Sequence, residues 1–400
     1  MPKDNNIPMS SPHLTEDDIN AVTQVLETPH LSQGPKVAAF EEAIASYVGS
    51  RHAVAVNSGT SGLHLAVIAA GIDEGDLVIT TPFSFIASAN CILFERAIPI
   101  FVDIDPQTKN IDPGQVAQAA EDLTSGGEAA RRWLPRSLRA SRDQPGELKA
   151  ILAVDVFGQP ADFDPLREVA DRYGLALIED SVEALGAEYK NRKAGTLGDV
   201  GAFAFYPNKQ MTTGEGGMLV TDHQEWANLF RSLRNQGRDA VMPDGLHHRL
   251  GYNYRMDEMS AALGLSQFQR IDDLLVKRER VAAWYNDRLS ELPDLSVPGI
   301  IPDTTIMSWF VYVIQARTHE IRDSLVHGLR EEGIPTRPYF NAIHLQPFYI
   351  DQYGYREGDF PSAEHAGQTC IALPFSGVMC EGQIDYVCES LRRFVDESSC

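Results

Sequence analysis

The sequence is poor in cysteine and in positive charge. Five cysteines are scattered through 400 residues without a C-x-x-C pair, which argues against a disulfide framework or a zinc site and fits a reducing compartment. Lysine and arginine number 34 against 56 acidic residues, so the net charge is −22. That charge disfavours nucleic acid and anionic membranes as partners, and an anionic ligand would need local donors.

Long apolar runs are also missing. No run reaches the roughly 20 residues that a membrane-spanning helix needs. The first ten residues, MPKDNNIPMS, lack the apolar core of a signal peptide. We therefore expect a soluble cytoplasmic protein with no membrane partner. A chain of 400 residues that is 43% hydrophobic can bury a sizeable core and usually forms two domains.

Strand and helix patterns alternate through the first part of the chain. Apolar strands are predicted at 53–56, 77–80, 99–102, 150–154 and 175–178, with helical stretches between them. This alternation is typical of an α/β fold with a mostly parallel sheet. After about residue 245 longer helices dominate. The pattern predicts a large α/β domain over 1–245 and a smaller α+β domain over 246–400.

Two helices are predicted before the first strand. Thr15 and Asp18 form a capping-box pattern, followed by Ile19, Val22 and Leu26 on one helix face. The second helix places Val37, Phe40, Ile44 and Val48 inward and ends at Gly49.

Residues 121–149 interrupt the alternation with a basic segment. It contains five arginines: Arg131, Arg132, Arg136, Arg139 and Arg142. Two interpretations stay open, namely a solvated surface insertion and a contact with substrate phosphates or a partner subunit.

The candidate for chemistry is Lys209, within FAFYPNKQMTTGEGG at 203–217. A strand that ends in a turn and presents one lysine beside small, flexible residues suits a lysine reached by a ligand. Such an amine can condense with a carbonyl to give a Schiff base when its pKa is lowered. The alternative is an ordinary solvated loop lysine.

Two further strand ends carry polar groups. The stretch Asn57–Gly62 follows a strand and opens a helix, a geometry that collects phosphate, although an ordinary βα turn is the alternative. Asp180 ends another strand, where ligands bind in open parallel sheets and where carboxylates also serve as caps. Asp103 and Asp105 form a D-x-D triplet that could bind a metal and a nucleotide sugar in a glycosyltransferase, or could form a turn.

A phosphate cradle, a strand-end aspartate and a later lysine together match the needs of pyridoxal phosphate. This cofactor needs a lysine for its aldehyde, an acid beside its ring nitrogen and an anchored phosphate. No metal site is predicted.

Six ordered motifs carry a resemblance over nearly the full length. They are Gln33-Gly34-Pro35, NSGTSGLHLA from Asn57, TPFSFIASAN from Thr81, IEDSVEALGA from Ile178, FYPNKQMTTGEGG from Phe205 and GYNYRMDEMSAALG from Gly251. The chain resembles the DegT/StrS family of pyridoxal-phosphate-dependent nucleotide-sugar aminotransferases. The resemblance implies the aspartate aminotransferase-like fold (fold type I of these enzymes) and a homodimer with shared active sites.

The resemblance also implies roles for single residues. Lys209 would bind the cofactor aldehyde and move the proton, and Asp180 would hold the ring N–H. The other cofactor-binding residues would be Ser58, Gly59, Thr60, Phe85, Glu183 and, from the other subunit, Asn253. The substrate-binding residues would be Gln33, Glu183, Arg255, Arg337, Tyr339 and His344.

The implied reaction moves an amino group from L-glutamate to a keto group of a nucleoside-diphosphate deoxysugar. The context of Glu183 resembles the perosamine-synthase-like branch and favours C4 over C3. Alternatives are a cyclitol or another keto compound as acceptor, and a catalytically silent regulatory homologue. A sugar dehydratase of the same family is disfavoured because that branch replaces the lysine with histidine.

Three features depart from the family pattern. Ala204 stands where many members have a serine that contacts the phosphate, and Asp155 stands in place of a histidine. The segment 121–149 is longer than in other members, and its arginines have no counterpart that explains them.

Overall fold

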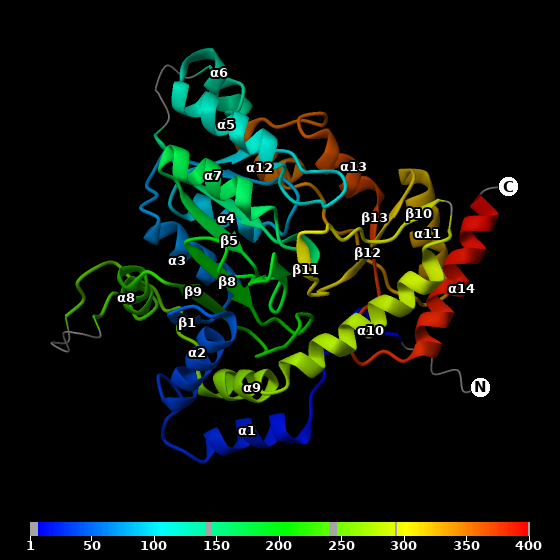
Figure 1. Ribbon diagram of the computed structural model, residues 1–400, viewed down its shortest axis with the longest axis horizontal. Helices are drawn as coiled ribbons and strands as arrows, with labels where there is room; N and C mark the ends of the chain where they lie inside the picture. Colours follow the sequence, from blue (N-terminus) through cyan, green and yellow to red (C-terminus); the bar gives the residue numbers. More distant parts are fainter. Residues whose placement is uncertain (1–6, 141–145, 240–245, 293, 399–400) are drawn as a thin grey trace.

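The computed structural model describes residues 7–140, 146–239, 246–292 and 294–398. A seven-stranded sheet forms the centre of the larger group of elements, in the order β1-β9-β8-β5-β4-β2-β3 (Figure 1). Five neighbouring strands are parallel, whereas β9 runs antiparallel to both β1 and β8. The strands are β1 (His52–Val56), β2 (Leu77–Thr80), β3 (Ile98–Phe101), β4 (Leu148–Val154), β5 (Ala176–Asp180), β8 (Val200–Ala204) and β9 (Gly217–Thr221). The predicted α/β class with a mostly parallel sheet is confirmed.

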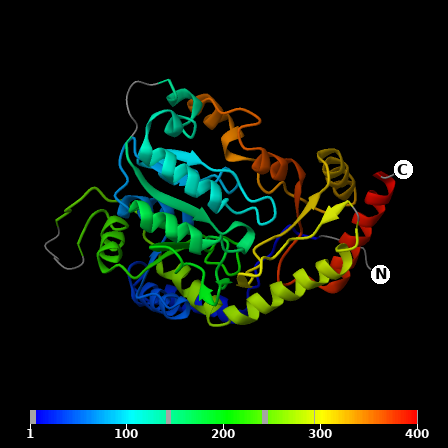
Figure 2. The ribbon, with the colours of Figure 1, turned by 45° about the horizontal axis from the view of Figure 1, so that its top comes forward.

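Helices cover both faces of this sheet (Figures 1 and 2). Alternate residues of a strand face opposite sides, so Val54 and Val56 join one core cluster while Ala53 and Ala55 join another. One face packs against α3 (Gly59–Ala69), α4 (Ala87–Phe94) and α8 (Gln224–Leu233). The other face packs against α2 (Pro35–Val48), α5 (Pro113–Ser125), α7 (Phe163–Tyr173) and α9 (Glu258–Phe268). Burial on both faces explains why the strands are almost wholly apolar.

Helix α2 agrees with its predicted pattern. Val37, Phe40, Ile44 and Val48 are its buried residues, and Gly49 ends the helix at φ 81°. Its first turn is capped by a residue far away in the sequence. The buried Glu258 carboxylate accepts the backbone N–H groups of residues 34, 36 and 37 at 2.8–3.0 Å. A carboxylate at a helix N-terminus satisfies N–H groups that lack helical partners.

Helix α1 (Glu16–Leu26) has the predicted capping box at Thr15, but its predicted apolar face is largely not buried. Ile19 and Leu26 are 55% and 61% exposed. The helix packs against α9 instead through the buried Asp18, whose carboxylate accepts from Ser266 at 2.7 Å and Arg270 at 2.5 Å. Polar partners supplied by a distant helix therefore decide how α1 docks, and periodicity within α1 cannot show them.

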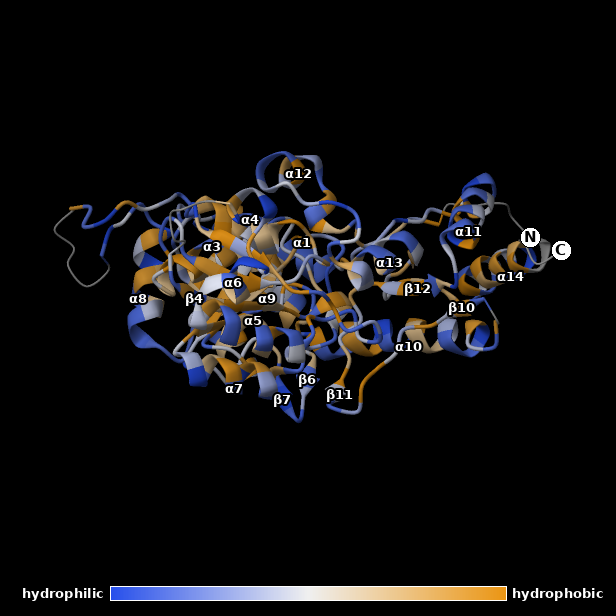
Figure 3. Cartoon of the chain, turned by 90° about the horizontal axis from the view of Figure 1, so that it is seen from above, coloured by the Kyte–Doolittle hydropathy of each residue, from blue (hydrophilic) through white to orange (hydrophobic). Residues whose placement is uncertain are grey.

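A second core lies in the C-terminal part of the chain. The sheet β10-β12-β13 consists of β10 (Leu295–Ser296), β12 (Tyr312–Ala316) and β13 (Cys370–Leu373). It packs with α10 (Ile271–Leu289), α11 (His319–Glu331) and α14 (Glu381–Ser398). In Figure 3 these elements lie to one side of the larger group, while α9 packs on α1 and α2. The proposed domain boundary near residue 245 stays a prediction.

Short elements complete the described chain. A third sheet joins β11 (Thr304–Ile306), β6 (Glu188–Tyr189) and β7 (Arg192–Lys193). Two helices, α12 (Pro347–Tyr353) and α13 (Pro361–Thr369), follow α11, and single 3-10 turns occur at Val156–Gly158 and Ile343–Leu345. None of the described helices is both long and apolar enough to cross a membrane.

The described residues 121–140 of the basic segment form a projection at the edge of the large sheet. It comprises the end of α5, the short helix α6 (Gly127–Arg131) and a 3-10 turn η1 (Arg136–Leu138). Arg131, Arg132 and Arg136 are exposed, and Leu134 is buried in the core below. Arg142 lies outside the described residues.

Candidate active site

The turn after β8 carries Lys209. Its backbone N–H donates to the Tyr206 carbonyl at 2.9 Å. The buried Arg278 guanidinium on α10 donates to the carbonyls of Asn208 at 3.1 Å and Lys209 at 2.6 Å, so the two cores are joined at this turn. Burial lowers the pKa of Arg278 to about 10. Arg278 was missed by the motif analysis. Its spacing of four residues from Leu274 and from Ala282 on the buried helix face is the signal that could have found it.

A cavity of about 530 Å³ surrounds the Lys209 side chain. Its walls come from the start of α3, the segment before α4, the end of β5, the turn after β8 and the C-terminal core. Eight of the predicted site residues line it: Ser58, Gly59, Thr60, Phe85, Asp180, Glu183, Lys209 and Tyr339. The fold thus brings together residues that are up to 281 positions apart, from 58 to 339.

The Lys209 amine lies among a carboxylate and an aromatic ring. Nζ is 3.5 Å from Glu183 Oε1 and 3.7 Å from the centre of the Phe310 ring. Burial lowers the pKa of Lys209, and the charges of Glu183 and Asp180 oppose that shift. A lysine with a lowered pKa has a larger fraction of neutral amine, which is the nucleophilic form.

Asp180 ends β5 and is fully buried. Its Oδ2 accepts from the Ser88 hydroxyl at 2.6 Å, and Oδ1 accepts from the Val182 N–H at 3.4 Å. Burial raises the pKa of Asp180 to about 6, and the Ser88 hydrogen bond opposes this rise. A cationic ring N–H placed beside this carboxylate would favour its ionised form. Ser88 lies within the motif that begins at Thr81, but the sequence alone does not mark it as a partner of Asp180.

Glu183 is oriented by a strained turn. Its Oε2 accepts from the Phe157 N–H at 2.9 Å, and Phe157 has φ 61°, which is rare for a non-glycine residue. Gly158 follows at φ 94°, where a Cβ would lie 1.7 Å from the Ser308 carbonyl oxygen. Burial raises the pKa of Glu183, and Lys209 opposes that rise.

The start of α3 faces the same cavity. Ser58 caps the helix, and its Oγ accepts from the Ser61 N–H at 3.1 Å. The first N–H groups of a helix have no helical partner and are suited to an anion. A Cβ at Gly59 would come within 2.7 Å of the Ala204 Cβ, so a glycine is needed for this close approach. These donors fit a phosphate.

The remaining cavity groups fit an aromatic cofactor ring. Phe85 lines the cavity and is 59% exposed, which leaves a ring available for stacking. Asn208 also lines it, and its Oδ1 is buried without a hydrogen-bond partner among the described residues. The residue set therefore fits pyridoxal phosphate: a lysine for its aldehyde, a carboxylate for its ring nitrogen and a helix start for its phosphate.

Five predicted substrate or cofactor residues do not line this cavity. His344 is fully buried, with Nε2 2.9 Å from Glu364, and burial lowers the pKa of His344. The Arg255 guanidinium donates to the Asn235 side chain at 3.0 Å. Gln33, Asn253 and Arg337 are exposed. Their predicted roles stay predictions, and that of Asn253 concerns the cavity of a second subunit.

The two aspartates of the D-x-D triplet, Asp103 and Asp105, do not line the Lys209 cavity. Asp103 accepts the backbone N–H groups of Ser362 and Ala363 at 2.9 Å, at the start of α13. Asp105 accepts those of Gln107 and Thr108 at 2.9 and 2.8 Å. Both aspartates thus act as caps of a helix and a turn, as in the structural interpretation of the D-x-D triplet.

The two residues that depart from the family pattern, Ala204 and Asp155, differ in their position relative to the Lys209 cavity. Ala204 lines the Lys209 cavity. Asp155 is fully buried and accepts the Ala161 N–H at 3.0 Å. Burial and then the nearby Glu179 raise the pKa of Asp155, so this position is a buried structural carboxyl outside the cavity lining.

The sequence matches the DegT/DnrJ/EryC1/StrS aminotransferase family over residues 12–392. The chain belongs to this family and is an aminotransferase.

Among its relatives, the spore coat polysaccharide biosynthesis protein SpsC of Bacillus subtilis is 36% identical, with 97% of each chain covered. The GDP-perosamine synthase of Caulobacter vibrioides is 36% identical, covering 96% of this chain and 97% of that protein. A DegT/DnrJ/EryC1/StrS aminotransferase of known structure from Brucella abortus is 30% identical, with a TM-score of 0.83 over 94% of this chain and 95% of the other. The aspartate aminotransferase-like fold is thereby confirmed.

We predict that Ser88→Ala raises the pKa of Asp180 by about one unit, because it removes a hydrogen bond that favours the carboxylate. A carbon-13 NMR titration of aspartate-labelled protein, assigned with Asp180→Asn, measures this. Ser84→Ala is the matched control, since Ser84 contacts the Ser88 hydroxyl at 2.7 Å and leaves the direct bond to Asp180 in place. An unchanged titration in Ser88→Ala would contradict the assignment.

Proposed function

We propose that this protein transfers the amino group of L-glutamate to a keto group of a nucleoside-diphosphate deoxysugar, at C4 rather than C3, with pyridoxal phosphate as cofactor. The observation that carries the proposal is the meeting of Lys209, Asp180 and the start of α3 in one cavity of about 530 Å³. The similarity to a GDP-perosamine synthase, 36% identical, supports a sugar substrate, and the context of Glu183 supports C4.

The chain's own groups would hold the cofactor. Gly59 and Thr60 would bind its phosphate, Phe85 would pack on its ring, and Asp180 would accept the ring N–H. Bound pyridoxal phosphate supplies an aldehyde that carries the amino group and a ring that withdraws electrons.

Lys209 has a second task, the movement of a proton. As a neutral amine, its Nζ would take the proton from the Cα of the amino donor and deliver it to the former aldehyde carbon of the cofactor. In the second half of the reaction it would take a proton from that carbon and deliver it to the acceptor carbon. Glu183 lies 3.5 Å from Nζ and would stabilise the ammonium form while Nζ carries a proton in each half of the reaction. The buried surroundings of Nζ keep competing water away from it.

The substrate side would be completed by a second subunit. Asn253 is exposed in a single chain and lines no part of its own cavity, which supports a contribution to the cavity of a partner copy. Four leucine and isoleucine side chains in and beside α1 are 44–61% exposed, and they would be covered in such a homodimer: Leu14, Ile19, Leu26 and Leu31. Gln33, Arg255, Arg337, Tyr339 and His344 would lie on the sugar-nucleotide side.

Lys209→Ala is expected to lower the rate of amino transfer by about 1,000-fold or more, because it removes both the covalent attachment and the base. The assay measures 2-oxoglutarate formed from L-glutamate in the presence of a 4-keto-6-deoxy sugar nucleotide. Lys149→Ala changes a half-buried lysine that pairs with Glu147 and does not line the cavity; it is the matched control and should keep full activity. Full activity in Lys209→Ala would overturn the proposal.

Sharing of the active site predicts complementation between two inactive variants. Lys209→Ala and Asn253→Ala subunits carry different affinity tags, are co-expressed, and are isolated as the doubly tagged heterodimer. One cavity of that heterodimer then has both wild-type groups, so we expect about half of the wild-type activity per dimer.

If Asn253 served its own subunit, both cavities of the heterodimer would be defective and no activity would return. Failure to isolate any doubly tagged species would contradict the homodimer itself.

A further inference from the structure

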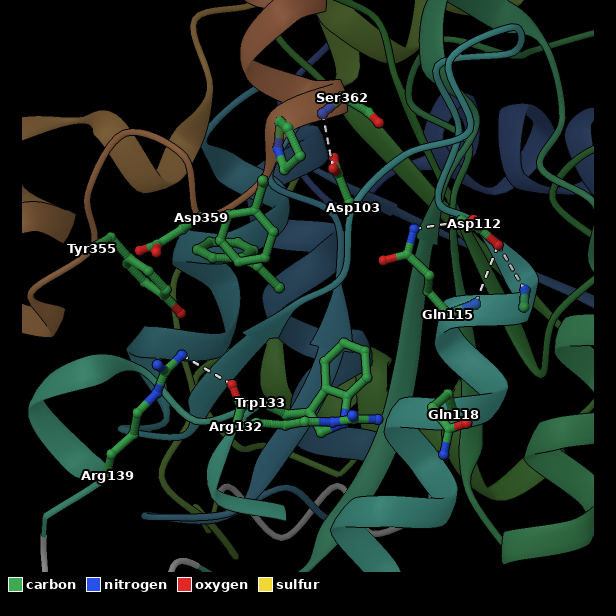
Figure 4. Close-up of a pocket in the computed structure, with 14 residues that line it drawn as sticks. Asp103, Asp112, Gln115, Gln118, Arg132, Trp133, Arg139, Tyr355, Asp359 and Ser362 are labelled. Carbon is green, nitrogen blue, oxygen red and sulfur yellow. Dashed lines mark hydrogen bonds between the residues drawn. The ribbon is translucent and has the colours of Figure 1, made fainter. Parts of the chain in front are cut away.

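A second cavity of about 720 Å³ lies at the carboxyl end of β3, the edge strand of the large sheet. Its walls are the start of α5, the α6–η1 projection and the loop between α12 and α13 (Figure 4). It shares no lining residue with the Lys209 cavity. Its volume falls within the range of small-molecule sites, about 300–1,000 Å³.

The projection that closes this cavity is fixed to its surroundings. The buried Asp122 carboxylate accepts from the Trp133 Nε1–H at 2.7 Å and pairs with Arg132, whose guanidinium lies 5.2 Å from the centre of the Trp133 ring. Arg136 makes a two-pronged ion pair with Asp359 on the opposite wall. Walls held in place by such contacts lower the ordering cost of binding a ligand.

The carboxylates that line the cavity are already engaged. Asp103 accepts the two N–H groups at the start of α13, and Asp112 accepts those of Gly114 and Gln115 at 2.8 and 3.2 Å. Asp359 is held by Arg136 and by the Arg356 N–H at 2.9 Å. The negative charge of each carboxylate is therefore partly compensated by N–H groups or an arginine of the protein itself.

Two other groups that line the cavity, the Arg139 guanidinium and the Tyr355 hydroxyl, can still donate hydrogen bonds to a ligand. The Arg139 guanidinium donates to the carbonyls of Leu134 and Arg132 at 2.9 Å, and no carboxylate pairs with it among the described residues. Tyr355 is 3% exposed, and within the described parts of the chain its hydroxyl has no hydrogen-bond partner. In Figure 4 that hydroxyl points toward Arg139. A buried, unpaired hydroxyl beside an arginine favours an anionic oxygen as its missing partner.

The amide side chains of Gln115 and Gln118 define the other half of the ligand. Their NH₂ groups donate to Asp112 at 3.0 Å and to Asp122 at 3.1 Å, which leaves both amide oxygens as acceptors. Acceptors of this kind suit the hydroxyl groups of a sugar. The rings of Trp133 and Phe360 add apolar surface for the C–H faces of the sugar ring.

We propose that this cavity binds a phosphorylated sugar, with the phosphate at Arg139 and Tyr355 and the hydroxyl groups at Gln115 and Gln118. A phosphate in a chain of net charge −22 needs such a local cationic group. The ligand is either a free sugar phosphate or the sugar-phosphate end of a nucleotide sugar. The site is independent of the proposed amino transfer, because it uses none of the residues around Lys209.

Isothermal titration of the full-length protein with bound pyridoxal phosphate tests this site. The probes are glucose 1-phosphate, UDP-glucose, glucose and inorganic phosphate. We expect glucose 1-phosphate or UDP-glucose to bind at least tenfold more tightly than glucose or phosphate alone, and the stronger of the two identifies the source of the ligand. Binding of phosphate as tight as that of both sugar phosphates would overturn the assignment.

Three variants locate the binding. Arg139→Gln removes the charge and should weaken the binding of the sugar phosphate by about tenfold or more. Tyr355→Phe removes one hydroxyl with little change of shape and should weaken it by about fivefold. Arg131→Gln is the matched control, since Arg131 lies in the same basic segment, is exposed and does not line the cavity.

We expect the Arg131→Gln variant to bind like the wild type. Unchanged affinity in both Arg139→Gln and Tyr355→Phe, or no binding of any sugar phosphate to the wild type, would overturn the proposal. Circular dichroism and thermal melting check that each variant is folded, and Tyr355→Phe keeps the test decisive if Arg139→Gln does not fold.

Discussion

The arrangement of the whole site depends on the hydrogen bonds that one buried guanidinium donates to the turn that carries Lys209. Arg278 donates from α10 to the carbonyls of Asn208 and Lys209, and it also donates to the Phe310 carbonyl at 3.2 Å. A single side chain therefore fixes the lysine-bearing turn, and the ring against which the Lys209 amine lies, at the junction of the two cores. A buried charge of this kind is tolerated because backbone carbonyl oxygens surround it.

The electrostatics of the cavity follow from its burial. Two carboxyl groups and one amine share a space with little solvent, so burial disfavours the charged form of each while their mutual attraction favours it. Burial raises the pKa of Asp180 to about 6, and it lowers the pKa of Lys209. The balance leaves a carboxylate able to hold a cationic ring and an amine that loses its proton more readily than an exposed lysine does. These are the two properties that amino transfer requires of the protein.

Much of the fold and the centre of the site could be predicted from the sequence. The alternation of apolar strands and helices predicts the parallel sheet, and parallel strands place their carboxyl ends at one edge. Because β5 and β8 are neighbours, with Asp180 opposite Ala202, the aspartate and the lysine turn meet at that edge. The helix start at Ser58 joins them because β1 ends near the same edge across β9, with Val56 opposite Gly217.

Other parts could not be predicted because they depend on contacts between distant segments. Arg278 reaches its partners across about 70 positions of sequence, and Ser88 reaches Asp180 across 92. The apolar residues of α1 suggested burial, yet the docking of that helix rests on Asp18 and two partners, Ser266 on α9 and Arg270 directly before α10. The arginines of the segment 121–149 showed a basic cluster. Only the folded chain shows that Arg139 and Tyr355 line one cavity.

The role of Lys209 is best tested by the visible absorption spectrum of the purified protein with pyridoxal phosphate, recorded before and after addition of L-glutamate. We expect a yellow protein whose visible band is lost when glutamate donates its amino group, and whose band returns when a keto-sugar nucleotide accepts that group. A protein that stays colourless with added pyridoxal phosphate, or whose visible band does not respond to L-glutamate, would contradict the assignment of Lys209 and its cavity to amino transfer.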